Sequence, residues 1–109
     1  MMRRTIVLAI LFSLFAIGSS HAVPPDVNGK VSAICVGGGG IVYFTVAGAQ
    51  YAGCATNDRY VIDTSAQAGR SQYTLVLSAY LSGQNVTVGP RGECNTMPND
   101  AEDIYAISF

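Results

Sequence analysis

The amino-acid sequence predicts a small, mainly β domain with one helix, folded as a five-stranded barrel. Short runs rich in β-branched and aromatic residues recur along the chain, and clusters of glycine, proline and asparagine separate them. A single stretch, between Thr64 and Gly83, spaces its apolar residues as a helix does. The resulting order of elements is three strands, one helix and two strands.

The first 22 residues have the three parts of a secretory signal peptide. Two arginines stand near the start, an apolar run extends from Ile6 to Gly18, and small residues occupy positions 20 and 22. The run is 13 residues long, whereas a membrane-spanning helix needs about 20. We therefore expect cleavage after Ala22, a single mature domain of residues 23–109, and a secreted or periplasmic protein with no membrane attachment.

The charge balance and the position of the histidine narrow the classes of function. Cleavage would leave four basic residues against seven acidic ones, a net charge of −3, which disfavours a nucleic acid or an anionic membrane as partner. His21, the one histidine, leaves with the signal peptide. Most serine and cysteine nucleophiles and many zinc sites depend on histidine. We therefore expect a protein that is not an enzyme, with no catalytic residue, no metal and no cofactor.

Alternating apolar residues define the predicted strands. Lys30–Val36 and Ile41–Val46 form a hairpin, which the glycines at 37–40 connect. The third extended segment joins Gln50–Ala55 with Tyr60–Ile62. The last two strands are predicted at residues 84–88 and 104–109, with a loop between them.

The helix is predicted to begin with a capping box of Thr64 and Gln67 and to end at Gly83. Its apolar stripe is expected to face the core, with Leu77 at the centre. The members of that stripe are Tyr73, Val76, Leu77, Tyr80 and Leu81. No charged residue lies between Ser71 and Gly83, which favours a helix face that contacts another subunit of a homo-oligomer. A monomer whose helix presents hydrated hydroxyl and amide groups is the alternative.

This order of elements is typical of a five-stranded Greek-key barrel, the oligonucleotide- and oligosaccharide-binding (OB) type, which suits a domain of this size. In that barrel the helix lies between the third and fourth strands. An open α+β sheet with the helix packed across one face is the alternative. Either fold suits the 87 residues from 23 to 109, which form one compact domain with a thin core.

The three cysteines, at positions 35, 54 and 94, allow one intrachain disulfide. Loop-closure entropy gives about 4 kcal/mol for joining Cys54 to Cys94 and about 3 kcal/mol for joining Cys35 to Cys54, a difference too small to decide the pairing. Position favours Cys54 and Cys94, because the first ends an extended segment and the second follows a strand, on either side of the helix. Cys35 is then expected as a buried thiol within a strand.

One pattern of residues is distributed over roughly residues 50–105. Its members are Cys54, the run from Tyr60 to Ser65, Gly69, Tyr73, Leu77, Ala79, Gly83, Val86, Val88, Gly92 and Cys94. The pattern resembles a family of small secreted bacterial proteins without a settled function. The resemblance implies that the two cysteines of that family correspond to Cys54 and Cys94, whereas Cys35 lies outside the pattern.

A looser, topological similarity links the chain to the pentameric B subunits of bacterial AB5 toxins. Those subunits are similar in size, export signal, single disulfide and order of strands and helix. The similarity implies glycan binding by analogy of fold, and it transfers no functional residue.

Two tyrosines and several acidic residues are the candidate functional residues. Tyr43 lies on the face of its strand opposite the more apolar one, and Tyr51 borders a loop. Both are weak candidates for a ring that packs against a sugar. Asp63 precedes the helix, which favours a capping role. The acidic segment of Asn99, Asp100, Glu102 and Asp103 lacks the spacing of a calcium loop and is expected as a solvated turn.

These observations favour a secreted or periplasmic, non-enzymatic binding module whose ligand is a glycan, a peptide or another exported protein. A hydrolase that uses Asp63 and Glu102 as paired carboxylates is the alternative within enzymes. A structural or inhibitory envelope protein is the third class. Nothing in the sequence places Asp63 near Glu102.

Overall fold

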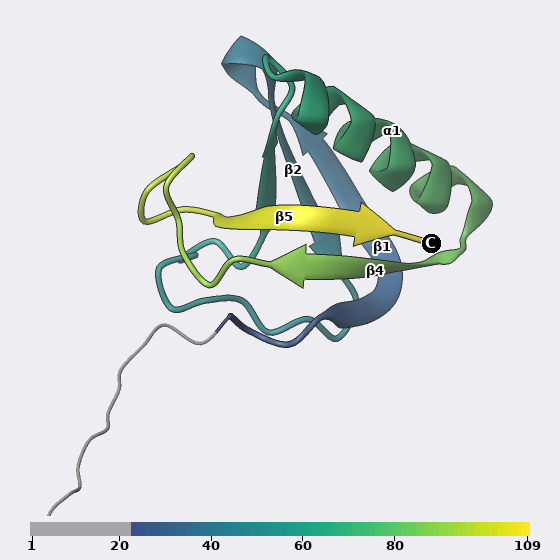
Figure 1. The fold of residues 1–109 in the computed structure, drawn as a ribbon, viewed down its shortest axis with the longest axis horizontal. Coiled ribbons are helices and arrows are strands. Elements are labelled where there is room, and N and C mark those ends of the chain that lie inside the picture. The colour runs from purple at the N-terminus through teal and green to yellow at the C-terminus, as the bar shows by residue number, and fades with distance from the viewer. Residues whose placement is uncertain (1–22) are drawn as a thin grey trace, which may run out of the picture.

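The computed structural model describes residues 23–109 and shows five strands and one helix (Figure 1). The elements are β1 (Val27–Val36), a short 3-10 turn (Gly38–Gly40), β2 (Ile41–Val46), β3 (Tyr60–Asp63), α1 (Gln67–Ser82), β4 (Asn85–Pro90) and β5 (Glu102–Ser108). The predicted signal peptide lies outside the described residues. Within residues 23–109, no helix has the length and apolar character needed to cross a membrane.

The five strands form one sheet that closes on itself in the order β1-β2-β3-β5-β4, which confirms the predicted mainly β fold of five strands and one helix. Every neighbouring pair is antiparallel except β3 and β5. Strand β1 pairs with two neighbouring strands: Val27–Lys30 pair with β4, and Val31–Val36 pair with β2. The register shifts between Val31 and Ala33, and a bulge there bends the strand from one partner to the other.

The strand boundaries agree with the sequence in part. Strand β2 occupies the predicted residues, and β1 begins three residues before the predicted start. The prediction of an extended segment at Gln50–Ala55 is wrong, because this stretch turns back on itself. The Ala55 amide donates to the Ala52 carbonyl, and the Ala52 amide donates to the side chain of Glu102.

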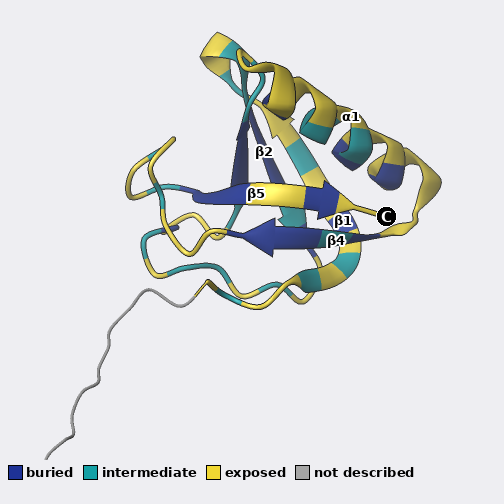
Figure 2. Cartoon of the chain, in the orientation of Figure 1, coloured by how far each residue is buried: buried dark blue, intermediate teal, exposed yellow. Residues whose placement is uncertain are grey.

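The core fills the barrel and the space between the barrel and α1. Tyr60 is fully buried at its centre, and its ring lies 5.3 Å from that of Phe44 and 4.7 Å from that of Tyr51. Val76 and Ala79 close the core from the helix side. In Figure 2 the buried part of the helix faces the sheet, and its outer part is exposed.

The buried face of α1 differs from the predicted stripe. Val76 is buried as expected, but Leu77 is 36% exposed and Leu81 75% exposed, so the placement of Leu77 at the centre of the core is wrong. The cause lies in the first turn of the helix. Gly69 packs directly on the carbonyl of Asp63, where a Cβ atom would overlap the carbonyl oxygen. This contact turns the face that holds Gly69 and Val76 toward the barrel.

The helix ends as predicted and begins differently. Gly83 is the C-cap in the left-handed conformation, with φ of 72°, and its amide donates to the Ala79 carbonyl. The N-cap is Ala66, not Thr64, and it makes no side-chain capping bond. The Thr64 hydroxyl instead donates to the Gly40 carbonyl at 2.6 Å, which ties the glycine turn to β3. The predicted capping box is therefore wrong.

Asp63 has a local role different from the predicted helix capping. Its Oδ1 atom accepts hydrogen bonds from the amide and the hydroxyl of Ser65, two residues on. These bonds lower the pKa of the Asp63 carboxyl. Asp63 therefore fixes the turn that precedes α1.

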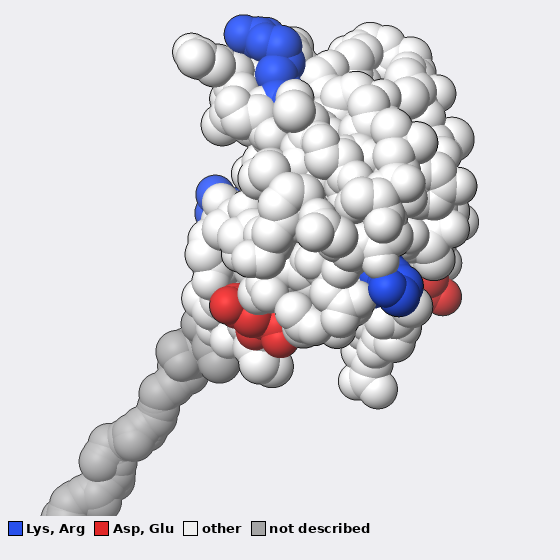
Figure 3. Space-filling model, turned by 90° about the vertical axis from the view of Figure 1, so that its right-hand side faces the viewer, with Lys and Arg blue, Asp and Glu red and all other residues white. Residues whose placement is uncertain are grey.

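Charged side chains are sparse on the side of the molecule where α1 ends. Figure 3 shows a broad central area without Lys, Arg, Asp or Glu, and the charged groups lie at its margin.

Candidate functional site

Two long loops, residues 47–59 and 91–101, are held together beside the barrel. The disulfide between Cys54 and Cys94 joins them, which confirms the predicted pairing. The Asn57 amide donates to the Asp100 carbonyl at 3.1 Å, and the Thr56 hydroxyl donates to the Asn99 carbonyl at 2.6 Å. The two loops therefore form one rigid unit.

Glu102 and Asp103 are buried, so the prediction of a solvated acidic turn is wrong for these two residues. Glu102 is 1% exposed and accepts hydrogen bonds from the amides of Ala52 and Gly92, both at 2.8 Å. Asp103 accepts hydrogen bonds from the amides of Asn95 and Thr96. Each carboxylate thus satisfies backbone N–H groups of a loop that would otherwise lack partners.

The loop 91–101 folds over the outer face of β2 and β3 and covers Tyr43. Ala101 and Met97 pack with Tyr43 and Val61 in a second small apolar cluster outside the barrel. Tyr43 is consequently 9% exposed, so the structure corrects the expectation of an open ring at this position.

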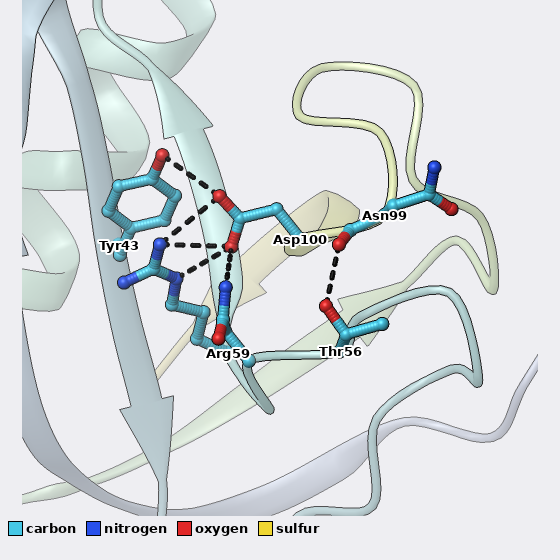
Figure 4. A network of polar contacts seen from close by, with 6 residues as sticks. Tyr43, Thr56, Arg59, Asn99 and Asp100 are labelled. Atoms are coloured by element: carbon cyan, nitrogen blue, oxygen red, sulfur yellow. Dashed lines mark hydrogen bonds and ion pairs between the residues drawn. The ribbon is translucent and has the colours of Figure 1, made fainter.

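The guanidinium of Arg59 lies over the ring of Tyr43, with its carbon 3.6 Å from the ring centroid (Figure 4). Two of its nitrogens, Nε and Nη2, donate to the carboxylate of Asp100 at 3.0 and 3.1 Å. The third nitrogen, Nη1, takes part in none of these bonds. The Asn57 amide and the Arg59 guanidinium, both hydrogen-bonded to Asp100, lower the pKa of its carboxyl.

A shallow pocket of about 250 Å³ lies beside this group, on the outer face of β1 and β2. Its lining residues are Ala33, Cys35, Tyr43, Phe44, Thr45, Asn57 and Arg59. Cys35 is an exposed free thiol, and the expectation of a buried one is wrong. In β1 the preceding residue, Ile34, packs against the core, and successive side chains of a strand point to opposite faces.

The second candidate tyrosine, Tyr51, is half-buried in a different place. Its hydroxyl accepts a hydrogen bond from the Val46 amide at 3.1 Å, and its ring packs on Tyr60. Tyr51 lines a larger pocket, of about 540 Å³, between the first residues of the domain and the loop 47–59. The two tyrosines therefore belong to separate surfaces.

The carboxylates of the alternative hydrolase do not share a cleft. Asp63 lines a pocket between α1, β3 and β5, whereas Glu102 lines the pocket of Tyr51. Asp103 shares the pocket of Asp63, but backbone amides occupy both of its oxygens. Among residues 23–109, no three His, Cys, Asp or Glu side chains lie close enough together to hold a metal ion.

Arg59, Asp100 and Asn57 hold this site together, and sequence reasoning overlooked Arg59 and Asn57. Arg59 directly precedes β3, and Asp100 stands two residues before β5. Since β3 and β5 are parallel neighbours paired from Tyr60 and Glu102 onward, residues just before each strand must meet. Opposite charges at those two positions were the signal.

No family model matches the chain, and neither the curated proteins nor the solved structures include a significant match to it.

Proposed function

We propose that the mature chain is an exported, non-enzymatic binding module that holds a glycan on the surface formed by Arg59, Tyr43 and the neighbouring pocket. The observation that carries the proposal is the guanidinium fixed between Tyr43 and Asp100. Its N–H donors are oriented before any ligand arrives, and such preorganisation lowers the entropic cost of binding. The pocket combines apolar lining residues, such as Ala33, with the fixed N–H donors of Arg59. This combination suits a sugar, which presents C–H groups and hydroxyls together.

The barrel architecture supports this choice of surface. Proteins of the OB type bind oligosaccharides and oligonucleotides on the face of strands 2 and 3 and on nearby loops. The pocket of Arg59 shares β2 with that face and takes Asn57 and Arg59 from the loop before β3, although β1 forms its other side. With a net charge of −3 for residues 23–109, an oligonucleotide is the less suitable ligand. The topological similarity to toxin B subunits points to glycans by analogy alone.

The disulfide indicates that the protein folds in an oxidising compartment. The Cys54–Cys94 disulfide is typical of proteins outside the cytosol. Together with the signal peptide predicted from the sequence, it supports a secreted or periplasmic protein. The hydrolase alternative is weaker, because Asp63 and Glu102 line different pockets.

The test of the site is glycan binding by the protein that starts at Val23, since residues 23–109 hold all five strands, the helix and the disulfide. A glycan array identifies candidates, and titration in solution measures their affinity. Ala33→Arg places a long side chain in the pocket of Arg59 and is expected to weaken binding at least tenfold. Gln84→Arg adds the same charge at an exposed position between α1 and β4 and should bind as the parent does. Undiminished binding by Ala33→Arg would refute this surface.

We also propose that the module is a homo-oligomer, which would give weak glycan sites avidity. The corrected orientation of α1 strengthens the argument, because Leu77, Tyr80 and Leu81 are exposed on the part of the helix from Ser71 onward, which has no charged residue. The charge-free area of Figure 3 lies on the side of the molecule where α1 ends. Strand β5 pairs with β3 only through Glu102 and Asp103, so one edge from Ile104 onward lacks a strand partner within residues 23–109.

Native mass spectrometry at micromolar concentration tests the assembly. We expect a multiple of the chain mass for the parent and a monomer for Leu81→Asp, with Gln67→Asp on the exposed first turn as the matched control. A monomeric parent would refute the oligomer without touching the proposal for the Arg59 surface.

A further inference from the structure

We propose that the pocket of Tyr51 binds an organic ammonium group. This pocket lies between the first residues of the domain, the loop 47–59 and the ends of β4 and β5, and its volume is about 540 Å³, a size typical of ligand sites. Its lining residues are Pro24, Pro25, Asp26, Val27, Asn28, Gly48, Gln50, Tyr51, Ala52, Pro90 and Glu102.

The charged residues that line the pocket are all acidic. Asp26 and Glu102 line it, and no Lys or Arg does. Burial raises the pKa of the Tyr51 hydroxyl, the hydrogen bond from the Val46 amide opposes this rise, and the negative charges of Asp58 and Glu102 add to it. Glu102 is buried, and backbone amides, not a cation, contact its oxygens. A positive group in the pocket would compensate this buried charge.

The hydroxyl of Tyr60, a residue that packs against the lining residue Tyr51, is buried without a hydrogen-bond partner within residues 23–109. Tyr60 as a whole is fully buried. Burial raises the pKa of Tyr60, and the nearby Glu102 and Tyr51 raise it further. The Tyr60 ring packs against that of Tyr51, which lines the pocket, with the ring centroids 4.7 Å apart. Buried hydroxyls almost always have a partner. An ordered water between Tyr60 and the pocket wall would supply it.

The walls of the pocket are fixed before binding. The Tyr51 hydroxyl bonds to the Val46 amide, and Glu102 bonds to loop amides on both sides of the pocket floor. The Pro24 ring lies so close to Gly92 that a Cβ there would be 3.0 Å from it. Carboxylates, an aromatic ring and side-chain amides form a site that attracts a cation with N–H donors and disfavours anions.

An ammonium group has two sources. One is a small amine from the surroundings. The other is the protein itself, because signal cleavage after Ala22 would create an α-ammonium at Val23, next to Pro24 of the lining. The two sources share their chemistry, and blocking the α-amino group distinguishes them.

The experiment titrates the protein of residues 23–109 with ethanolamine at neutral pH and follows the NMR signals of Tyr51 and Asn28. N-acetylethanolamine, which lacks the charge, is the matched neutral probe. The titration is repeated with the Val23 amine acetylated. Asp26→Asn removes one lining charge, and Glu93→Gln removes an exposed charge that does not line the pocket.

Saturable shifts with ethanolamine, weakened at least threefold by Asp26→Asn and unchanged by Glu93→Gln, support a free amine as the occupant. Binding only after acetylation, with a lower melting temperature for the acetylated protein, supports the chain's own α-ammonium. Equal binding of the neutral probe, or no binding to either form, overturns the proposal.

Discussion

Replacing Glu102 by glutamine tests whether this buried carboxylate organises the two loops. Its oxygens accept hydrogen bonds from the amides of Ala52 and Gly92, both at 2.8 Å, and the residue is 1% exposed. A glutamine amide has one oxygen and one NH2 group. It therefore accepts from one backbone N–H and directs its own hydrogens at the other.

The cost follows from that mismatch. One charge-assisted hydrogen bond disappears, and one buried N–H group keeps no acceptor, which costs about 1–3 kcal/mol. Loss of the desolvated charge offsets part of this cost. For a domain of this size each kcal/mol lowers the melting temperature by about 4–8 °C, so Glu102→Gln is expected to melt about 5–20 °C below the parent.

Thermal and urea unfolding of the oxidised protein measure the effect, and Glu93→Gln on the exposed part of the same loop is the control. Because the disulfide stays intact in both variants, a difference reports the net effect of losing the hydrogen bond and the buried charge, and not a change in cross-linking. A Glu102→Gln variant within about 0.5 kcal/mol of the control would show that Glu102 does not hold the loops, and the reasoning from its two bonds would fail.

Four further outcomes follow from the geometry. Gly69→Ala should cost several kcal/mol, seen as a large drop in melting temperature, because its methyl group overlaps a strand carbonyl; an unchanged melting temperature would contradict this packing. Cys35 should react with maleimide in the folded, oxidised protein, and a requirement for denaturant would show that it is buried. The pKa of Asp100 is lowered in the folded state, so its stabilising effect is complete above about pH 4 and is lost as the pH falls further; Asp100→Asn should flatten that part of the stability curve. Val76→Asp should unfold the domain while Leu77→Asp costs about 1 kcal/mol or less, and equal losses would contradict the observed orientation of α1.

The sequence predicts the barrel because its local signals and its order of elements agree. The alternation in Ile41–Val46 and the glycine turn before it specify the first hairpin, and Gly83 specifies the end of the helix. The apolar pattern does not predict which face of the helix is buried. It depends on the contact of Gly69 with a carbonyl six residues earlier, and apolar spacing cannot show that a glycine, with no side chain, marks the buried face.

The site is harder to predict than the fold, since it depends on loops. Tyr43 is buried by a loop more than 50 residues further along the chain, and the pairing of Arg59 with Asp100 requires β3 and β5 to be parallel neighbours. Glu102 and Asp103 stand in an acidic segment that is typical of a solvated turn. Their burial follows only when the amides that they bind are known.

The disulfide encloses a particular part of the chain. Cys54 and Cys94 are 40 residues apart, and the covalent ring that they close contains β3, α1 and β4. The exposed turn around Gly83 and Gln84 lies within this ring, and such turns are where proteases cut first. A single cut there opens the ring without separating the molecule into two pieces, so both halves of the barrel stay attached for as long as the bond remains oxidised.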